Sequence, residues 1–190
     1  MPVSLLHDLR STLVSWPSGS SAEEEERKEW LALASDPALL SRSGTPAHFT
    51  ASALPVDPDT GRVCLVLHPR IGAWVQPGGH FESEDSTVVD AAAREMEEET
   101  GLGGMVDPVP LRLSRHPAPC GTGEWHLDLQ LLAVVPAGRR PRVSPESLDV
   151  AWFAVDALPP DIASGVEGLV AAARERLSRS GTPVPPSPAG

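Results

Sequence analysis

The chain has 190 residues and a formal net charge of −11, because 15 Lys and Arg stand against 26 Asp and Glu. Its length predicts one domain with a hydrophobic core of its own. The negative charge argues against nucleic acid or anionic membranes as partners, and no apolar run approaches the roughly 20 residues that span a bilayer. The N-terminus lacks the basic start and apolar block of a signal peptide, so a cytoplasmic protein is expected.

The two cysteines lie far apart and lack the spacing of a metal site. Cys64 falls in an apolar run and is predicted to be a core residue, and a reduced setting is expected for it and for Cys120. Arg139, Arg140 and Arg142 form a local basic group. We interpret this group as a solvated hairpin loop, with contact to a phosphate as the alternative.

Residues 1–43 are expected to form an N-terminal helical extension. Leucines recur at helical spacing near its start, and Ser21 with Glu24 three residues later predicts a capping box that opens a second helix. The sequence leaves the role of the extension open between a lid, a contact in a homodimer and simple packing.

Strand-like runs dominate the middle of the chain. They occupy residues 49–56, 62–68, 73–76, 111–115, 125–135 and 150–155. The segment Asp57-Pro58-Asp59-Thr60-Gly61 joins the first two runs as a turn, and Pro77-Gly78-Gly79 is interpreted as a turn after the third.

One helix is expected between the strands and one after them. Thr87 with Asp90 predicts a capped helix that starts near Val88, and the segment Pro159-Pro160-Asp161 is expected to open the last helix. Residues 179–190 are rich in proline and are expected to stay disordered. This order of elements favours an α+β domain.

The most informative segment is the acidic run within the inserted helix. Glu95, Glu98 and Glu99 stand at i, i+3 and i+4, so they share one face of a helix that turns about 100° per residue, and Glu97 points away. Three carboxylates on one face repel one another unless a hard cation lies between them, and Mg²⁺ is such a cation. The alternative is a solvated acidic helix face.

The residues around these glutamates resemble the signature of the Nudix hydrolases, G-x5-E-x7-R-E-U-x-E-E-x-G-U, in which U is a bulky aliphatic residue. The matching residues are Arg94, Glu95, Met96, Glu98, Glu99, Gly101 and Leu102. Gly79 fills the start of the pattern, and Asp85 stands where the family prefers Glu. Eight residues separate Asp85 from Arg94 where the pattern has seven. We place the extra residue in the loop before the helix, which leaves Asp85 or Glu84 as the first acidic position.

The resemblance implies a Nudix domain over residues 44–178, folded as an α/β/α sandwich around a mixed sheet. It implies Mg²⁺-dependent cleavage of a diphosphate linkage, with Mn²⁺ as the alternative ion. By resemblance Glu95, Glu98, Glu99 and the carbonyl of Gly78 are metal ligands, and Arg94 orients the carboxylates.

The base that deprotonates the attacking water stays open among three glutamates. Glu98 and Glu99 are two candidates, and Glu146, in a loop before the last strand, is the third. For Glu146 a solvated loop glutamate is the alternative.

A polar face of one strand is predicted to line the site. His126, Asp128 and Gln130 alternate with leucines, so they share one face, and a polar face on a central strand is costly unless it lines a cleft. His48 and His80 are candidates for the same cleft as substrate-binding residues. The alternative for each histidine is a structural hydrogen bond. Their sequence contexts resemble a group of bacterial Nudix proteins.

Residues outside the signature narrow the substrate class. The chain has no tyrosine, which argues against dinucleoside-polyphosphate types, and the sequences of the NADH and coenzyme A types are missing. Pro117 stands where ADP-ribose types have a proline. A small phosphorylated substrate is expected: a (d)NTP, ADP-ribose or a nucleotide sugar. A non-catalytic ligand sensor and an isopentenyl-diphosphate isomerase are the rival functions.

Overall fold

The structure is a computed structural model that describes residues 3–42, 46–117 and 125–179. Its helices are α1 (Val3–Ser15), α2 (Ser21–Leu33), the 3₁₀ helix η1 (Pro37–Leu40), α3 (Val88–Thr100) and α4 (Val166–Arg179). Its strands are β1 (Ala47–Asp57), β2 (Arg62–His68), β3 (Ala73–Val75), β4 (Gly78–His80), β5 (Met105–Val106), β6 (Arg112–Pro117), β7 (Trp125–Val134) and β8 (Asp149–Ala154).

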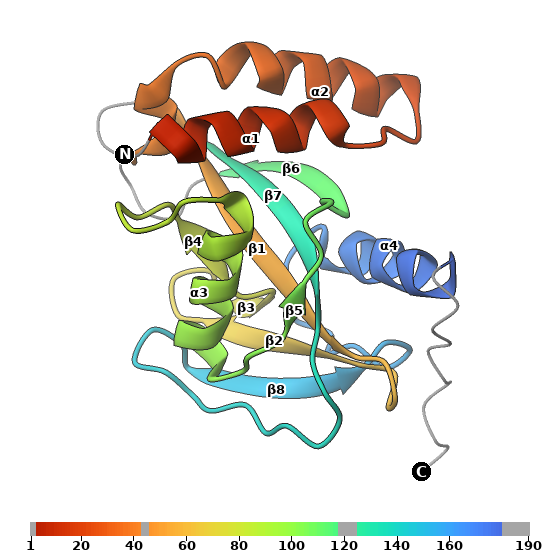
Figure 1. The fold of residues 1–190 in the computed structure, drawn as a ribbon. Helices are drawn as coiled ribbons and strands as arrows, with labels where there is room; N and C mark the ends of the chain where they lie inside the picture. Colours follow the sequence, from red (N-terminus) through yellow and green to blue (C-terminus); the bar gives the residue numbers. More distant parts are fainter. Residues whose placement is uncertain (1–2, 43–45, 118–124, 180–190) are drawn as a thin grey trace.

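A mixed sheet holds all eight of these strands, in the order β3-β2-β1-β7-β5, with β4 paired to β1, β6 to β7 and β8 to β2. The long strand β1 lies at its centre (Figure 1). β1 runs parallel to β7, with His48 opposite His126, and antiparallel to β4, with Thr50 opposite His80. The predicted α+β class with a mixed sheet is confirmed.

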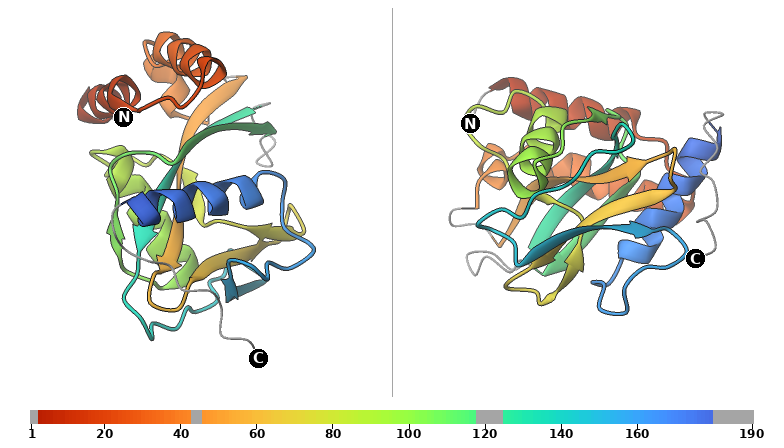
Figure 2. Two further views of the ribbon diagram at one scale, coloured as in Figure 1. Left: turned by 90° about the vertical axis from the view of Figure 1, so that its right-hand side faces the viewer. Right: turned by 90° about the horizontal axis from the view of Figure 1, so that it is seen from below.

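Helices cover both faces of the sheet, as the views of Figures 1 and 2 show. On one face α1, α2 and α3 share a core with alternate residues of β1 and β7, such as Phe49 and Leu127. On the other face α4 packs on residues such as Leu54, Val56 and Leu132. His48, Thr50 and Ser52 lie on the α4 face too, because side chains alternate along a strand. That face of β1 is therefore apolar at one end and polar at the other.

The N-terminal helices belong to the main core. Leu9 and Leu13 of α1 and Trp30 of α2 are fully buried, in the same cluster as Phe49. The carboxylate of Asp8 accepts a hydrogen bond of 2.8 Å from the backbone N–H of Val88 at the start of α3. The extension thus packs against the helix that carries the glutamates.

The expected cap of α2 is displaced by one residue. Ser20, rather than Ser21, is the N-cap: its backbone is extended and its side chain accepts from the N–H of Glu23. Ser21 is already helical, so its hydroxyl is not placed to cap the first turn. The cap of α3 is as expected, since Thr87 and Asp90 form a reciprocal capping box.

The last helix begins later than expected, at Val166 instead of after Pro159-Pro160-Asp161. The intervening backbone pairs with β3: the N–H of Trp74 donates to the carbonyl of Asp161, and the N–H of Ala163 donates to the carbonyl of Trp74. Gly165 then adopts a φ of 92°, which favours glycine. The segment that was expected to form the first turn of α4 therefore pairs with β3 instead.

The segment interpreted as a turn, Pro77-Gly78-Gly79, leads directly into a short strand. Gly78 to His80 form β4 and pair antiparallel with β1. The prediction of a turn was wrong because adjacent glycines usually indicate a turn. Here glycine at position 78 lets the backbone of β4 come close to β1, since a Cβ on Gly78 would lie 2.3 Å from the Cβ of Ser52. The two-residue strand β5 was also not anticipated.

Two further expectations concern the burial of Cys64 and the presence of membrane-spanning helices. Cys64 is fully buried, which confirms it as a core residue. No helix among the described residues is long and apolar enough to cross a bilayer. The expected disordered tail began at Arg179, but Arg179 is the last residue of α4. The expectations for Cys120 and for residues 180–190 lie outside the described residues.

Candidate active site

The site is built around one face of α3. The capping box at Thr87 fixes its start, and Gly101, with a φ of 66°, ends it. Between these ends Glu95 and Glu99 are buried, whereas Glu97 and Glu98 are both exposed. Figure 1 shows α3 beside β4, and these two elements bring the acidic face against the glycine pair.

The buried carboxylates contact the backbone of that glycine pair. Glu99 Oε2 accepts a hydrogen bond of 3.0 Å from the N–H of Gly78. A Cβ on Gly79 would lie 2.4 Å from Glu95 Oε1, so glycine is required there for the carboxylate to come close. The acidic groups and the backbone of β4 thus meet at one place.

Burial makes the charged form of these carboxylates costly. It raises the pKa of Glu99 to about 8, against the lowering effect of the Gly78 N–H, and the charge of Glu95 adds to the rise. It raises the pKa of Glu95 to about 7, although Arg94 opposes the rise. A bound cation would favour the charged form of both.

Arg94 makes hydrogen bonds to three neighbouring carboxylates. It donates to Glu95 at 2.9 Å and to Glu98 at 3.2 Å, and its Nε and Nη2 donate to the two oxygens of Asp85. Asp85 is buried, whereas Glu84 is exposed. Asp85, rather than Glu84, therefore occupies the first acidic position of the signature.

A cavity of about 720 Å³ opens beside the glutamates. The glutamates at positions 95, 98, 99 and 146 line it, together with Gly78, Gly79, His80 and His126. Glu146 comes from the loop before β8, so the structure brings this distant candidate to the site. Arg42 and Arg70 also line the cavity. Sequence reasoning missed both, because a single arginine in a loop carries no pattern.

The basic group that sequence reasoning did single out lies elsewhere. Arg139, Arg140 and Arg142 are not among the residues that line this cavity. The N–H of Arg142 instead donates to the carbonyl of Thr100 at the end of α3. All three side chains are exposed, as expected for a solvated loop.

A second cavity, of about 280 Å³, adjoins the first and shares Gly78, Gly79 and His126 with it. Asp128 lies on its wall and is buried. Its carboxylate accepts from Ser52 at 2.7 Å and from Thr50 at 3.1 Å. Gln130 also lines this cavity, which confirms that the alternating polar face of this strand faces a cavity.

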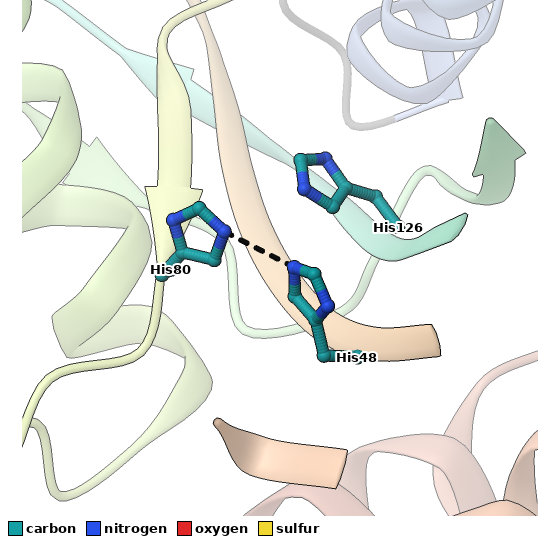
Figure 3. A group of neighbouring side chains, drawn as sticks. All are labelled: His48, His80 and His126. Carbon is teal, nitrogen blue, oxygen red and sulfur yellow. Dashed lines mark hydrogen bonds between the residues drawn. The ribbon is translucent and has the colours of Figure 1, made fainter. Parts of the chain in front are cut away.

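Three histidines, from β1, β4 and β7, lie side by side, as Figure 3 shows. His126 lines both cavities and His80 lines the larger one, whereas His48, which was expected in the same cleft, is fully buried and lines neither. His48 Nε2 and His80 Nε2 lie 3.1 Å apart, and the ring centroids of His48 and His126 are 4.8 Å apart. Burial lowers the pKa of His126 to about 3 and that of His80 to about 4, and it lowers the pKa of His48 as well. The three imidazoles are therefore neutral at pH 7.

A comparison with protein-family models gives a match to the NUDIX domain over residues 46–173, about two thirds of the chain. The chain belongs to the Nudix family. It is accordingly a Nudix pyrophosphohydrolase. A comparison with curated protein sequences gave no match.

Solved Nudix structures share the fold of this chain. A Nudix-family hydrolase from Clostridium perfringens aligns with a TM-score of 0.56 at 22% identity, covering 70% of this chain and 97% of its own. The MutT Nudix hydrolase from Burkholderia pseudomallei gives 0.52 at 26%, covering 66% and 97%. The Nudix domain of Shewanella oneidensis NrtR, complexed with ADP ribose, gives 0.56 at 22%, covering 79% and 97%.

The donors at the Nudix signature fit the divalent cation that the family implies. Mg²⁺ prefers oxygen ligands, and the described residues offer the carboxylates of Glu95, Glu98 and Glu99 beside the backbone of Gly78. Glycine at position 79 leaves room for the Glu95 carboxylate. The chemistry and the crowding of these donors both suit a small hard ion.

Proposed function

We propose that this Nudix enzyme hydrolyses a diphosphate linkage in a small substrate of the nucleoside-diphosphate type, such as a (d)NTP, ADP-ribose or a nucleotide sugar, with Mg²⁺ as cofactor. The observation that carries the proposal is the acidic face of α3 against the Gly78–Gly79 backbone, on the wall of a cavity of about 720 Å³. The products are a monophosphate and a second phosphorylated fragment.

Glu95, Glu98, Glu99 and the carbonyl of Gly78 would hold the ion. When bound, Mg²⁺ supplies charge neutralisation on the phosphates and lowers the pKa of a coordinated water. Mn²⁺ offers the same chemistry at the same ligands. Arg94 keeps Glu95 and Glu98 in place through its two hydrogen bonds, so we assign it a positioning role.

The rest of the large cavity is suited to bind and orient the phosphates. Arg42 and Arg70 line it with positive charge, and phosphate oxygens accept hydrogen bonds from guanidinium groups. A water attacks phosphorus, the anhydride P–O bond breaks, and the proton of the water passes to a carboxylate. Glu98, Glu99 and Glu146 all line this cavity, so each is a candidate for that base.

The smaller cavity is suited to the non-phosphate part of the substrate. Asp128 and Gln130 place polar atoms on its wall, and hydrogen bonds to such groups discriminate strongly between similar ligands. His126 lines both cavities and His80 lines the larger one, and the ring of His48 packs against both of these rings. We assign Asp128 and the three histidines to substrate binding, directly or through a bound ion. Pro117 also lines this cavity, so ADP-ribose belongs in any substrate screen.

The test is a screen for Mg²⁺-dependent release of monophosphate from (d)NTPs, ADP-ribose, nucleotide sugars, NADH and prenyl diphosphates. Glu98→Gln should lower the rate on the best substrate by about 100-fold or more, since it removes the negative charge of an ion ligand that is also a candidate base. Glu97→Gln is the matched control, because Glu97 is also exposed on α3 but does not line the cavity. It should keep the wild-type rate.

Two outcomes would overturn the proposal. Equal rates for the Glu98 and Glu97 variants would remove Glu98 from the site. A panel that stays intact, with one compound raising the melting temperature, would replace hydrolysis by ligand sensing.

A further inference from the structure

We propose that His48, His80 and His126 form a second metal site, which binds a transition-metal cation of the Zn²⁺ class at the edge of the phosphate cavity. The signature carboxylates that are assigned to Mg²⁺ take no part in it. The inference concerns cation binding by imidazoles, so it stands whether or not the carboxylates support hydrolysis.

The geometry of the three rings carries the proposal. Each histidine offers one ring nitrogen, and these three atoms lie within 4.8 Å of one another. Two nitrogens at 2.0–2.1 Å from a tetrahedral Zn²⁺ lie about 3.3 Å apart. The Nε2 atoms of His48 and His80 are already 3.1 Å apart. A modest rotation of the His126 ring completes a three-ligand set.

The sheet places these side chains on three neighbouring strands. His48 is the direct partner of His126 across the parallel pair β1–β7. Thr50, two residues along the same face, is the direct partner of His80 across β1–β4. Three ligands on paired strands are held more firmly than ligands on loops. Figure 3 shows each ring projecting from its own strand.

The donor type selects the class of ion. Neutral imidazole is the metal-binding form of histidine, and burial favours that form. His48 is fully buried and His126 is 8% exposed. Imidazoles suit Zn²⁺, Cu²⁺ and Ni²⁺, whereas Mg²⁺ prefers oxygen. The cluster is therefore matched to a different ion from that of the acidic face of α3.

The position of the cluster suggests what a bound ion would contact. His80 and His126 line the larger cavity together with Arg42, Arg70 and the glutamates. Three protein ligands leave the fourth position of a tetrahedral ion to water or to an oxygen of a bound molecule. A phosphate in the cavity would provide such an oxygen. The ion would then add positive charge to the wall of the cavity that also holds Arg42 and Arg70.

Zinc titration of the metal-stripped full chain, followed by calorimetry, tests the site directly. With Mg²⁺ in excess to occupy the carboxylates, wild type and the triple variant Glu95→Gln/Glu98→Gln/Glu99→Gln should both bind one zinc ion. His48→Gln and His126→Gln should each weaken binding by at least about 10–100-fold, a loss that even the partners of metal ligands produce. The matched control is His7→Gln, at an exposed position on α1, which should bind as wild type does.

Binding that is unaffected by the His48 and His126 variants would overturn the proposal, as would binding that is lost only in the carboxylate variant. X-ray absorption on zinc-loaded wild type covers the case in which a histidine variant fails to fold. Scattering from several imidazoles is expected. A shell of oxygen ligands alone would overturn the site. Hydrolysis of the substrate panel is measured separately, so failure of one proposal leaves the other intact.

Discussion

Glycine at position 79 leaves the space that the Glu95 carboxylate occupies. We predict that Gly79→Ala lowers Mg²⁺-dependent activity by about 100-fold, since a Cβ there would lie 2.4 Å from Glu95 Oε1 and a misplacement of about 1 Å costs on that scale. The Glu95 carboxylate must then leave its contact with Arg94. Kinetics with increasing Mg²⁺ measure the loss.

Gly103→Ala is the control for this change. Nothing lies within 4 Å of the Cβ that it would add, so it should keep wild-type kinetics. Equal activity of the two alanine variants would mean that the carboxylate does not need the space at Gly79.

At the residue scale, site residues could be predicted from the sequence where they recur at the period of a helix or a strand. Glu95, Glu98 and Glu99 share a face because a helix has a fixed period, and that period can be read without a structure. Arg42 and Arg70 could not be found in this way. Their place in the cavity depends on how two loops fold over the sheet, and a loop arginine has no period.

The loop before α3 carries the departure from the family pattern. The structure starts α3 at Val88 and anchors Asp85 on Arg94, so Ser86 lies between two fixed points. We predict that deleting Ser86 leaves a single cooperative unfolding transition, since it shortens a connection and keeps the register of the residues within α3. Urea denaturation measures the transition.

Deletion of Ala92 is the comparison. Ala92 is fully buried in α3, and its loss would turn the glutamates by about 100° relative to the first turn of the helix. That variant should lose cooperative unfolding. If the Ser86 deletion unfolds as badly, the extra residue is part of the helix and our placement of it is wrong.

At the element scale the sequence predicted the long elements better than their ends. The strong turn at Asp57–Gly61 and the capping box at Thr87 are local signals, and both are found. The start of α4 depends instead on backbone pairing between Asp161 and Trp74. Such a contact joins segments far apart in the chain, so no local pattern reveals it.

At the scale of the whole molecule the N-terminal helices behave as part of the core. We predict that Leu9→Ala lowers the free energy of unfolding by about 2–5 kcal/mol, the usual cost of removing a buried leucine side chain. Leu9 is fully buried, whereas Val14 on the same helix is 64% exposed. Val14→Ala is therefore the control, and it should stay within about 0.5 kcal/mol of wild type.

Urea denaturation followed by tryptophan fluorescence distinguishes two models of the extension. A large effect of Leu9→Ala on a single transition means that the extension and the sheet unfold together. Two separate transitions, or an effect equal to that of Val14→Ala, would mean that the helices are a loosely attached module.

The central pairing of the sheet also sets the order in which the protein can be completed during synthesis. β1 ends at Asp57 and β7 begins at Trp125, so at 5–20 residues per second the ribosome needs roughly 3–14 s to supply the partner of β1. The leucines of α1 are synthesised earlier still, and Leu127 and Leu129, which belong to the same hydrophobic cluster, follow more than 100 residues later. The nascent chain therefore exposes an apolar helix to chaperones, and it acquires His126 and Asp128 only after the segments that carry His48, His80 and the glutamates of α3.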